Sequence, residues 1–272
     1  MVYFLSDAHI GSRAVDDASH QQRFVDLLQQ LAKDATAIYL LGDIFDFWAE
    51  YFWRDRSKAE YEPVLSCLRS LTSRGIDVHY FIGNHDIWTY GELARLTGVT
   101  IHRRPEIMTI SGKRCFLAHG DGLVPSGYLD QFPREVRKKI RSFMRLRRLF
   151  HNPVAQFFFR LVPPSLGNRI GYNWAKRSRL KELADPCGYK GENREELVLF
   201  AKEQDNSQLS TINSQLSTIN YFIFGHRHIE LDLELASGAR VIILGDCFRQ
   251  WTYAAMDDNG KLQLLCIQDQ NN

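Results

Sequence analysis

The sequence predicts an α/β fold, and two observations along the 272-residue chain support this. Short apolar runs recur and end in small or polar residues, which is typical of buried strands. Helical patterns lie between the early runs, as they do in strand-helix-strand units. Residues 123–200 lack the strand pattern, so we expect them to form a helical insertion.

The expected strands occupy six apolar runs: 2–9, 37–46, 78–86, 114–121, 221–228 and 241–246. Residues 21–34 and 63–75 have the spacing of amphipathic helices, and Gly75 would end the second helix as a C-cap. Ser111-Gly112 and Asn259-Gly260 predict hairpin turns between alternating runs. The sheet content is therefore expected to be mixed, with antiparallel strands added to a parallel pattern.

Charge is distributed unevenly along the chain. The formal net charge is only +2, but residues 132–181 hold 14 Lys and Arg against a single acid, Glu135. Within that block, residues 136–150 read VRKKIRSFMRLRRLF, with apolar side chains at helical spacing. This pattern predicts a basic amphipathic helix that faces an anionic partner, whether phosphate, nucleic acid or membrane.

The five cysteines, at positions 67, 115, 187, 247 and 266, include no C-x-x-C pair, which favours a reducing compartment. The chain starts without a basic and apolar leader and has no run near the ~20 apolar residues of a spanning helix. We therefore expect a cytoplasmic protein whose membrane contact, if any, is peripheral. Residues 206–212 repeat identically as 213–219, NSQLSTI, which we interpret as a duplicated loop or helix extension without a catalytic role.

Five short motifs of potential ligands each follow a predicted strand. They are D-x-H at Asp7 and His9, G-D-x-x-D from Gly42 to Asp46, G-N-H-D at 83–86, H-G-D at 119–121 and G-H-x-H at 225–228. Each motif alone is more often a turn or a cap. Together they predict one site, because ligands of open α/β sheets bind at the carboxyl ends of the strands.

The residue types indicate a pair of divalent metal ions. Two cations about 3.5–4 Å apart can clamp the attacking and leaving oxygens of a phosphoryl displacement. They need a shared carboxylate, for which Asp43 is suited, and imidazole and carbonyl ligands on either side. Such donors favour Mn²⁺, with Fe or Zn²⁺ as alternatives. Gly42, Gly83 and Gly225 would let the backbone turn and bring the ligands close.

These motifs, in this order across residues 5–228, resemble the calcineurin-like metallophosphoesterase family. The resemblance implies a sandwich of two mixed β-sheets flanked by helices, formed by residues 1–272 with residues 123–200 as a cap. It implies a dinuclear site with the following ligands: Asp7, His9 and His228 for one metal, Asn84, His119 and His226 for the other, and Asp43 as the bridge. By the same resemblance, His85 is the general acid or phosphate-polarising residue, and Asp86 orients it.

A narrower resemblance covers nearly the whole chain and concerns the UDP-2,3-diacylglucosamine pyrophosphohydrolases of lipid A biosynthesis. Its residues are SDAHIGSR at 6–13, GDIFDFW at 42–48, GNHDIW at 83–88, HGDGL at 119–123, YNWAKRSR at 172–179 and LGDCFRQWTY at 244–253. It implies hydrolysis to UMP and 2,3-diacylglucosamine 1-phosphate, with the insertion covering the acyl chains. Members of that family carry Arg where this chain has His85, so the sequence resembles a divergent branch.

The resemblance to these enzymes implies that the basic helix contacts the inner membrane, where a diacylated substrate resides. The residues expected to bind substrate are Arg13, Arg141, Phe143, Arg145, Phe150 and Arg177. QFFFRLV at 156–162 could line an acyl pocket or belong to an ordinary helix core. No nucleic-acid partner is expected on this reading.

Three other functions share the predicted metal ligands. A soluble phosphoesterase of dinucleoside polyphosphates or cyclic nucleotides would leave the basic insertion unexplained. A nuclease would use the basic block along a phosphate backbone. A pseudoenzyme scaffold would have little reason to retain every ligand position, because an unused cluster of buried polar groups lowers stability.

Overall fold

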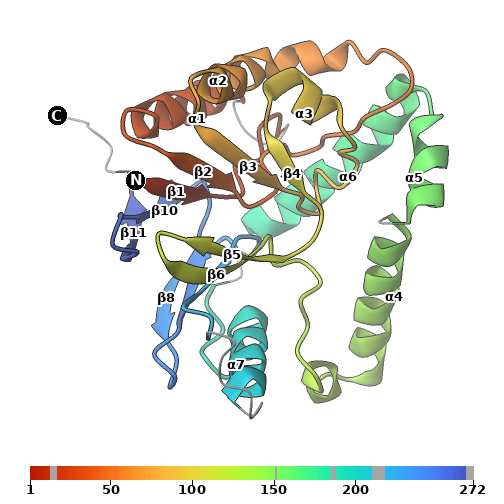
Figure 1. The fold of residues 1–272 in the computed structure, drawn as a ribbon. Coiled ribbons are helices and arrows are strands. Elements are labelled where there is room, and N and C mark those ends of the chain that lie inside the picture. The colour runs from red at the N-terminus through yellow and green to blue at the C-terminus, as the bar shows by residue number, and fades with distance from the viewer. Residues whose placement is uncertain (13–16, 151, 185–187, 210–217, 268–272) are drawn as a thin grey trace.

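Two mixed β-sheets pack face to face in the computed structural model (Figure 1), which describes residues 1–272 except 13–16, 151, 185–187, 210–217 and 268–272. The first sheet has the order β11-β10-β1-β2-β3-β4. Its strands are β1 (Val2–Leu5), β2 (Ala37–Leu40), β3 (Asp77–Phe81), β4 (Thr100–His102), β10 (Thr252–Met256) and β11 (Leu262–Cys266). Strands β1 to β4 are parallel, whereas β10 and β11 are antiparallel to their neighbours.

The second sheet has the order β5-β6-β7-β9-β8. Its strands are β5 (Glu106–Ile110), β6 (Lys113–Ala118), β7 (Tyr221–Phe224), β8 (Glu230–Glu234) and β9 (Arg240–Leu244). The three central strands β6, β7 and β9 are parallel, and β5 and β8 pair antiparallel at the two edges. Both sheets are therefore mixed, as the sequence predicted.

Successive side chains of the central strands point to opposite faces of the sheet, and both faces are buried, which explains why the apolar runs are continuous. On β1, Phe4 points into the core between the sheets, where it meets residues such as Ile223 of β7. Its neighbours Tyr3 and Leu5 point to the opposite face, which the helices cover. Each central strand is thus buried on both faces.

Helices cover the outer faces of the sandwich. Helices α1 (Asp17–Leu31), α2 (Glu62–Ser73) and α3 (Glu92–Thr97) pack on the first sheet through residues such as Phe24 and Leu68. A short 3-10 turn, η1 (Ser57–Tyr61), leads into α2. Helix α7 (Glu196–Leu209) covers the second sheet through Leu197 and Val198. Figure 1 shows these two helical layers on opposite sides of the sheets.

The described part of the segment between β6 and α7 contains helices joined by loops and no strand. It contains η2 (Tyr128–Gln131), α4 (Arg134–Phe150), α5 (Pro153–Arg160) and α6 (Pro164–Ala184). Asn152 begins α5, because its side chain accepts hydrogen bonds from the amides of Val154 and Ala155. Helix α6 is anchored by Tyr172 and Ala175, which pack in a small cluster with Phe47. Among the described residues, no helix combines the length and apolar composition that a membrane span requires.

Most of the predicted elements are confirmed. Each of the six predicted runs overlaps a strand, the strand ends before the ligand motif in the five runs that carry one, and both predicted helices are present. The two hairpin turns join β5 to β6 and β10 to β11. Ser111 and Gly112 both have positive φ, at 45° and 74°, as the favoured hairpin turn requires. The NSQLSTI repeat begins in the last turn of α7, and most of it lies outside the described residues.

Candidate metal centre

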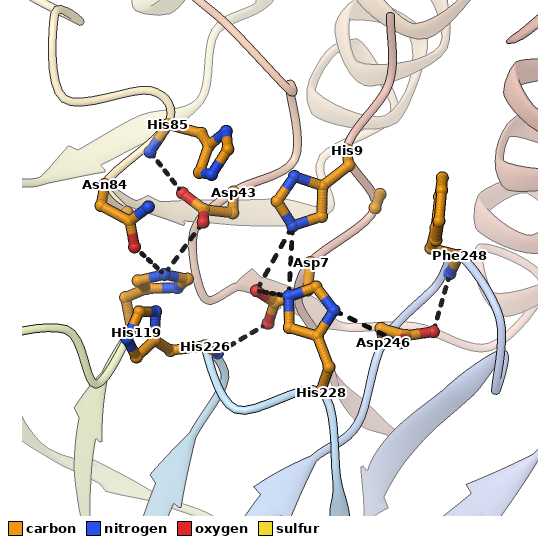
Figure 2. A network of polar contacts seen from close by, with 12 residues as sticks. Asp7, His9, Asp43, Asn84, His85, His119, His226, His228, Asp246 and Phe248 are labelled. Carbon is orange, nitrogen blue, oxygen red and sulfur yellow. Dashed lines mark hydrogen bonds and ion pairs between the residues drawn. The ribbon is translucent and has the colours of Figure 1, made fainter. Parts of the chain in front are cut away.

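The five ligand motifs meet at one edge of the sandwich because they follow neighbouring parallel strands. Loops after β1, β2 and β3 of the first sheet face loops after β6 and β7 of the second. In chain order, these loops carry Asp7, His9, Asp43, Asn84, His85, His119, His226 and His228. Figure 2 shows their side chains converging from both sheets into two adjoining clusters.

The first cluster consists of Asp7, His9 and His228, whose ligand atoms all lie within 4.8 Å of one another. Asp7 Oδ1 lies 3.2 Å from His228 Nε2 and 3.8 Å from His9 Nε2. The two imidazole Nε2 atoms lie 3.3 Å apart. The other carboxylate oxygen of Asp7 accepts a 2.8 Å hydrogen bond from the amide of His226, which ties this cluster to the next loop.

The second cluster consists of Asp43, His119 and His226, again with ligand atoms within 4.8 Å. Asp43 Oδ2 lies 3.3 Å from His119 Nε2, and Asn84 Oδ1 lies at the same distance from that nitrogen. His119 Nδ1 is bound to the Leu41 carbonyl at 2.8 Å. That contact places the proton on Nδ1 and leaves Nε2 as the ligand atom.

Two carboxylates that the sequence reasoning did not assign support the imidazoles from behind. Asp46, the last residue of G-D-x-x-D, contacts His9 Nδ1 at 3.1 Å. Asp246, which lies just after the end of β9, has a carboxylate oxygen 3.4 Å from His228 Nδ1. Carboxylates in this position fix the orientation of a metal-binding imidazole. Asp246 has a sequence signal that could have found it, since it follows a buried strand and a glycine in the same way as Asp43.

His85 and Asp86 are arranged differently from the expectation. Asp86 was expected to orient His85, but its carboxylate accepts hydrogen bonds from the amides of Gly83 and Ile44 and from the Tyr80 hydroxyl. The imidazole of His85 is instead held by the Asp46 carbonyl, 2.7 Å from Nδ1. Asp86 therefore shapes the loop that carries His85, while the Asp46 backbone fixes the ring.

Close backbone contact requires glycine at two of the predicted positions. A Cβ on Gly83 would overlap the Asp43 carboxylate, and one on Gly225 would lie 2.6 Å from Asp7 Oδ2. Both contacts are shorter than any side chain tolerates. The glycines therefore allow neighbouring loops to approach the carboxylates directly.

Electrostatics in the second cluster favour an added positive charge. Burial alone would lower the pKa of the His119 imidazole, but the Asp43 carboxylate, with Asp7 and Asp121, raises it to about 10. Burial would raise the pKa of Asp43, yet His119 and His85 hold it far below the usual range. His226 differs, because burial and the nearby His119 both lower its pKa. A cation bound at this cluster would take the place of the His119 proton.

The residues present fit a pair of divalent cations. Asp7 Oδ1 is buried and accepts no hydrogen bond from any described residue, although it lies between two imidazole nitrogens. An orphaned carboxylate oxygen of this kind is expected where a metal binds. The donor set of carboxylates, imidazoles and an amide oxygen suits a first-row divalent ion.

Comparison with known proteins agrees with this geometry. The model of the calcineurin-like phosphoesterase family matches residues 1–230. The chain belongs to that family. It is therefore a metal-dependent phosphoester hydrolase.

Similar proteins share nearly the full length of the chain. A UDP-2,3-diacylglucosamine hydrolase of Porphyromonas gingivalis is 33% identical over 267 residues, which cover 94% of each chain. The enzymes of that name from Haemophilus influenzae and Pseudomonas fluorescens are 26% and 25% identical and cover 97% and 96% of this chain. The alignments extend through the helical insertion as well as the metallophosphoesterase motifs.

An apolar cavity of about 480 Å³ adjoins the candidate metal centre of this metallophosphoesterase. Asn84 and His85 line it on the metal side, together with Asp46. The remainder is lined mostly by apolar side chains from the loops after β2 and β3 and from the insertion: Phe47, Ile87, Trp88, Leu146, Phe150, Phe159, Val162, Ile170 and Trp174. Trp88 and Phe159 stack with their ring centroids 3.7 Å apart. Phe159 and Val162 of QFFFRLV thus line a pocket, in agreement with one of the two alternatives predicted for that stretch.

The expected substrate-binding residues are scattered. Phe150 lines the cavity. Arg141 and Arg145 lie outside it, in a basic groove on the exposed side of α4, and Arg177 is exposed on α6. Arg13 lies outside the described residues, and Phe143 is placed on α4 without a described side chain.

Proposed function

We propose that this metallophosphoesterase hydrolyses the pyrophosphate bond of UDP-2,3-diacylglucosamine, giving UMP and 2,3-diacylglucosamine 1-phosphate. The apolar cavity beside the metal-binding clusters carries the proposal, because acyl chains need a dry, apolar site within reach of the reacting phosphate. Relatives that match this chain over nearly its full length bear the name of that activity. A nucleotide hydrolase without a lipid substrate would have no use for such a cavity.

Seven residues would hold the two cations: Asp7, His9 and His228 at one position, Asn84, His119 and His226 at the other, and Asp43 between them. When bound, the cations supply positive charge that stabilises the attacking and leaving oxygens. Mn²⁺ is the first candidate, with Fe or Zn²⁺ as alternatives. The buried carboxylates Asp46 and Asp246 keep the imidazoles in place.

His85 would act on the phosphate from the cavity side. A carbonyl oxygen only accepts, so the contact with Asp46 places a proton on Nδ1 of His85. That arrangement leaves Nε2 to donate a proton to a phosphate or leaving oxygen when the imidazole is protonated. General acid catalysis of this type contributes about 10²–10⁴-fold to the rate.

The direct test is to incubate the purified protein with Mn²⁺ and UDP-2,3-diacylglucosamine and to assay for UMP. We expect UMP release that Asp43→Ala abolishes while the variant remains folded. Dinucleoside polyphosphates and cyclic nucleotides serve as competing substrates in parallel. Faster turnover of those soluble nucleotides, with no UMP from the lipid, would refute the proposal.

We further propose that the insertion seats the enzyme on an anionic membrane surface. The groove on α4 is lined by Arg134, Arg137, Lys138, Arg141, Ser142 and Arg145. Beside it, α5 exposes Val154, Phe157 and Phe158, each with more than half of its surface accessible. Phe52 and Trp53, also exposed, are attached to this patch by hydrogen bonds to the carbonyls of Arg160 and Leu161. Large apolar side chains next to basic ones are the composition of interfacial helices.

A further inference from the structure

Arg147 lies where the apolar cavity meets the candidate metal centre. It lines the cavity in company with Asn84 and His85. Among the described residues that line this cavity, Arg147 alone is an Arg or Lys. Its side chain also lines a second, smaller hollow beside His119. Helix α4 therefore contributes one cationic side chain to the site, while its other described basic side chains line the groove or are exposed.

The guanidinium of Arg147 is held in place by the loop after β6. Its Nε forms an ion pair with Asp121, the buried carboxylate of H-G-D. The side chain also lies against Gly122, where φ is +75° and an added Cβ would be 3.2 Å from Arg147 Cδ. In the described part of the chain, the terminal Nη groups donate no hydrogen bond. The two Nη groups of the Arg147 guanidinium can therefore donate hydrogen bonds to a bound anion.

We infer that Arg147 binds the phosphate that is attached to glucosamine, an inference that rests on the proposed function. In the substrate, that phosphate connects the sugar bearing the acyl chains to the nucleotide. If the acyl chains occupy the cavity and the pyrophosphate reaches the metal-binding clusters, the sugar phosphate lies between them. Arg147 occupies this intermediate position, so it is a binding residue for the lipid half of the substrate rather than for UMP.

A purely structural role would give a different pattern. Arg147 could serve only to neutralise Asp121, whose carboxylate would otherwise be buried without its ion pair. Removing both charges together distinguishes the two roles. The double variant Asp121→Asn with Arg147→Gln should restore function if neutralisation is the whole role, and should stay defective if Arg147 contacts the substrate.

The experiment measures product binding by titration calorimetry with the Mn²⁺-loaded protein. Arg147→Gln should weaken binding of 2,3-diacylglucosamine 1-phosphate about 10- to 100-fold, as expected for a lost hydrogen bond to a charged group. UMP binding should weaken by a much smaller factor, and Arg147→Lys should be intermediate. Arg148→Gln removes an exposed charge from the neighbouring position of α4 and should bind both products normally.

Three results would overturn the inference: equal weakening for both products, recovery of lipid phosphate binding in the double variant, or wild-type binding by Arg147→Gln. Failure of the proposed function has its own signature, since the wild type would then neither release UMP from the lipid nucleotide nor bind the lipid phosphate. If the wild type releases UMP and binds the lipid phosphate, and Arg147→Gln binds that phosphate equally well, the proposed function stands and only the role of Arg147 is refuted.

Discussion

Metal binding at the second cluster should release a proton, and this makes affinity depend on pH. Without metal, the pKa of His119 is raised to about 10, mainly because the Asp43 carboxylate opposes the effect of burial. His119 is then protonated at neutral pH, and a cation must displace that proton to reach Nε2. The pKa of Asp43 is held low, so this carboxylate stays ionised across the neutral range and adds no second proton.

The magnitude follows from the position of that pKa. Below about pH 10, affinity at this cluster should rise about tenfold for each pH unit, since one proton is displaced. Between pH 6 and pH 8 the gain is about 100-fold, or about 2.7 kcal/mol. A histidine with an ordinary pKa near 6.5 would give only about a fourfold gain over this interval.

Titration calorimetry of Mn²⁺ into chelator-treated protein provides the assay. Repeating it in buffers of different ionisation enthalpy counts the protons released, and NMR titration of the metal-free protein reports the His119 pKa directly. Asp43→Asn should lower that pKa, because the carboxylate is the largest cause that raises it. A fourfold or smaller change in affinity, or a His119 pKa near 6.5, would refute the electrostatic account.

Three further predictions concern catalysis, the membrane and the cavity. His85→Ala should retain its metals and lose about 10²–10⁴-fold in kcat; loss of metal content, measured by elemental analysis, would instead make His85 a ligand. Arg141→Glu with Arg145→Glu should weaken flotation with anionic vesicles most strongly at low salt, because the attraction is screened within about 8–10 Å at physiological ionic strength; binding that does not respond to salt would contradict this. Phe150→Ser should raise KM for the diacylated substrate while sparing a small phosphodiester such as bis-p-nitrophenyl phosphate; equal loss on both, with a lowered Tm, would indicate packing alone.

Local patterns were enough to predict most of the strands, though not β4 or β8, and the candidate ligands. An apolar run on β1 or β7 is buried on both faces, and the polar residue that follows it has few places to lie other than the sheet edge. Asp7 and His228 were therefore predictable from their own surroundings. Their proximity in space follows from the strand order, which brings loops of both sheets to one edge.

Contacts between distant segments could not be predicted in this way. The partner of His85 is a backbone carbonyl, which carries no residue-type signal. The position of Arg147 depends on how α4 is set against the loop after β6, and one helical face offers several basic residues with equal claim. Trp88 and Phe159 stack across 71 positions of sequence, and their apolar character is equally compatible with an ordinary core.

The backbone at the metal centre supports a functional origin for the clusters. Seven described residues other than glycine have positive φ, and five of them are Asp7, His9, Asp43, His226 and His228. This conformation is unfavourable for side chains with a Cβ, at about 1–3 kcal/mol for a strained residue. Five such residues, several of them charged, would lower the stability of loops that served only to join strands. The two packed sheets impose the geometry, and a bound cation would balance the charge of the buried carboxylates, so the strain is retained where ligand atoms converge on a common point.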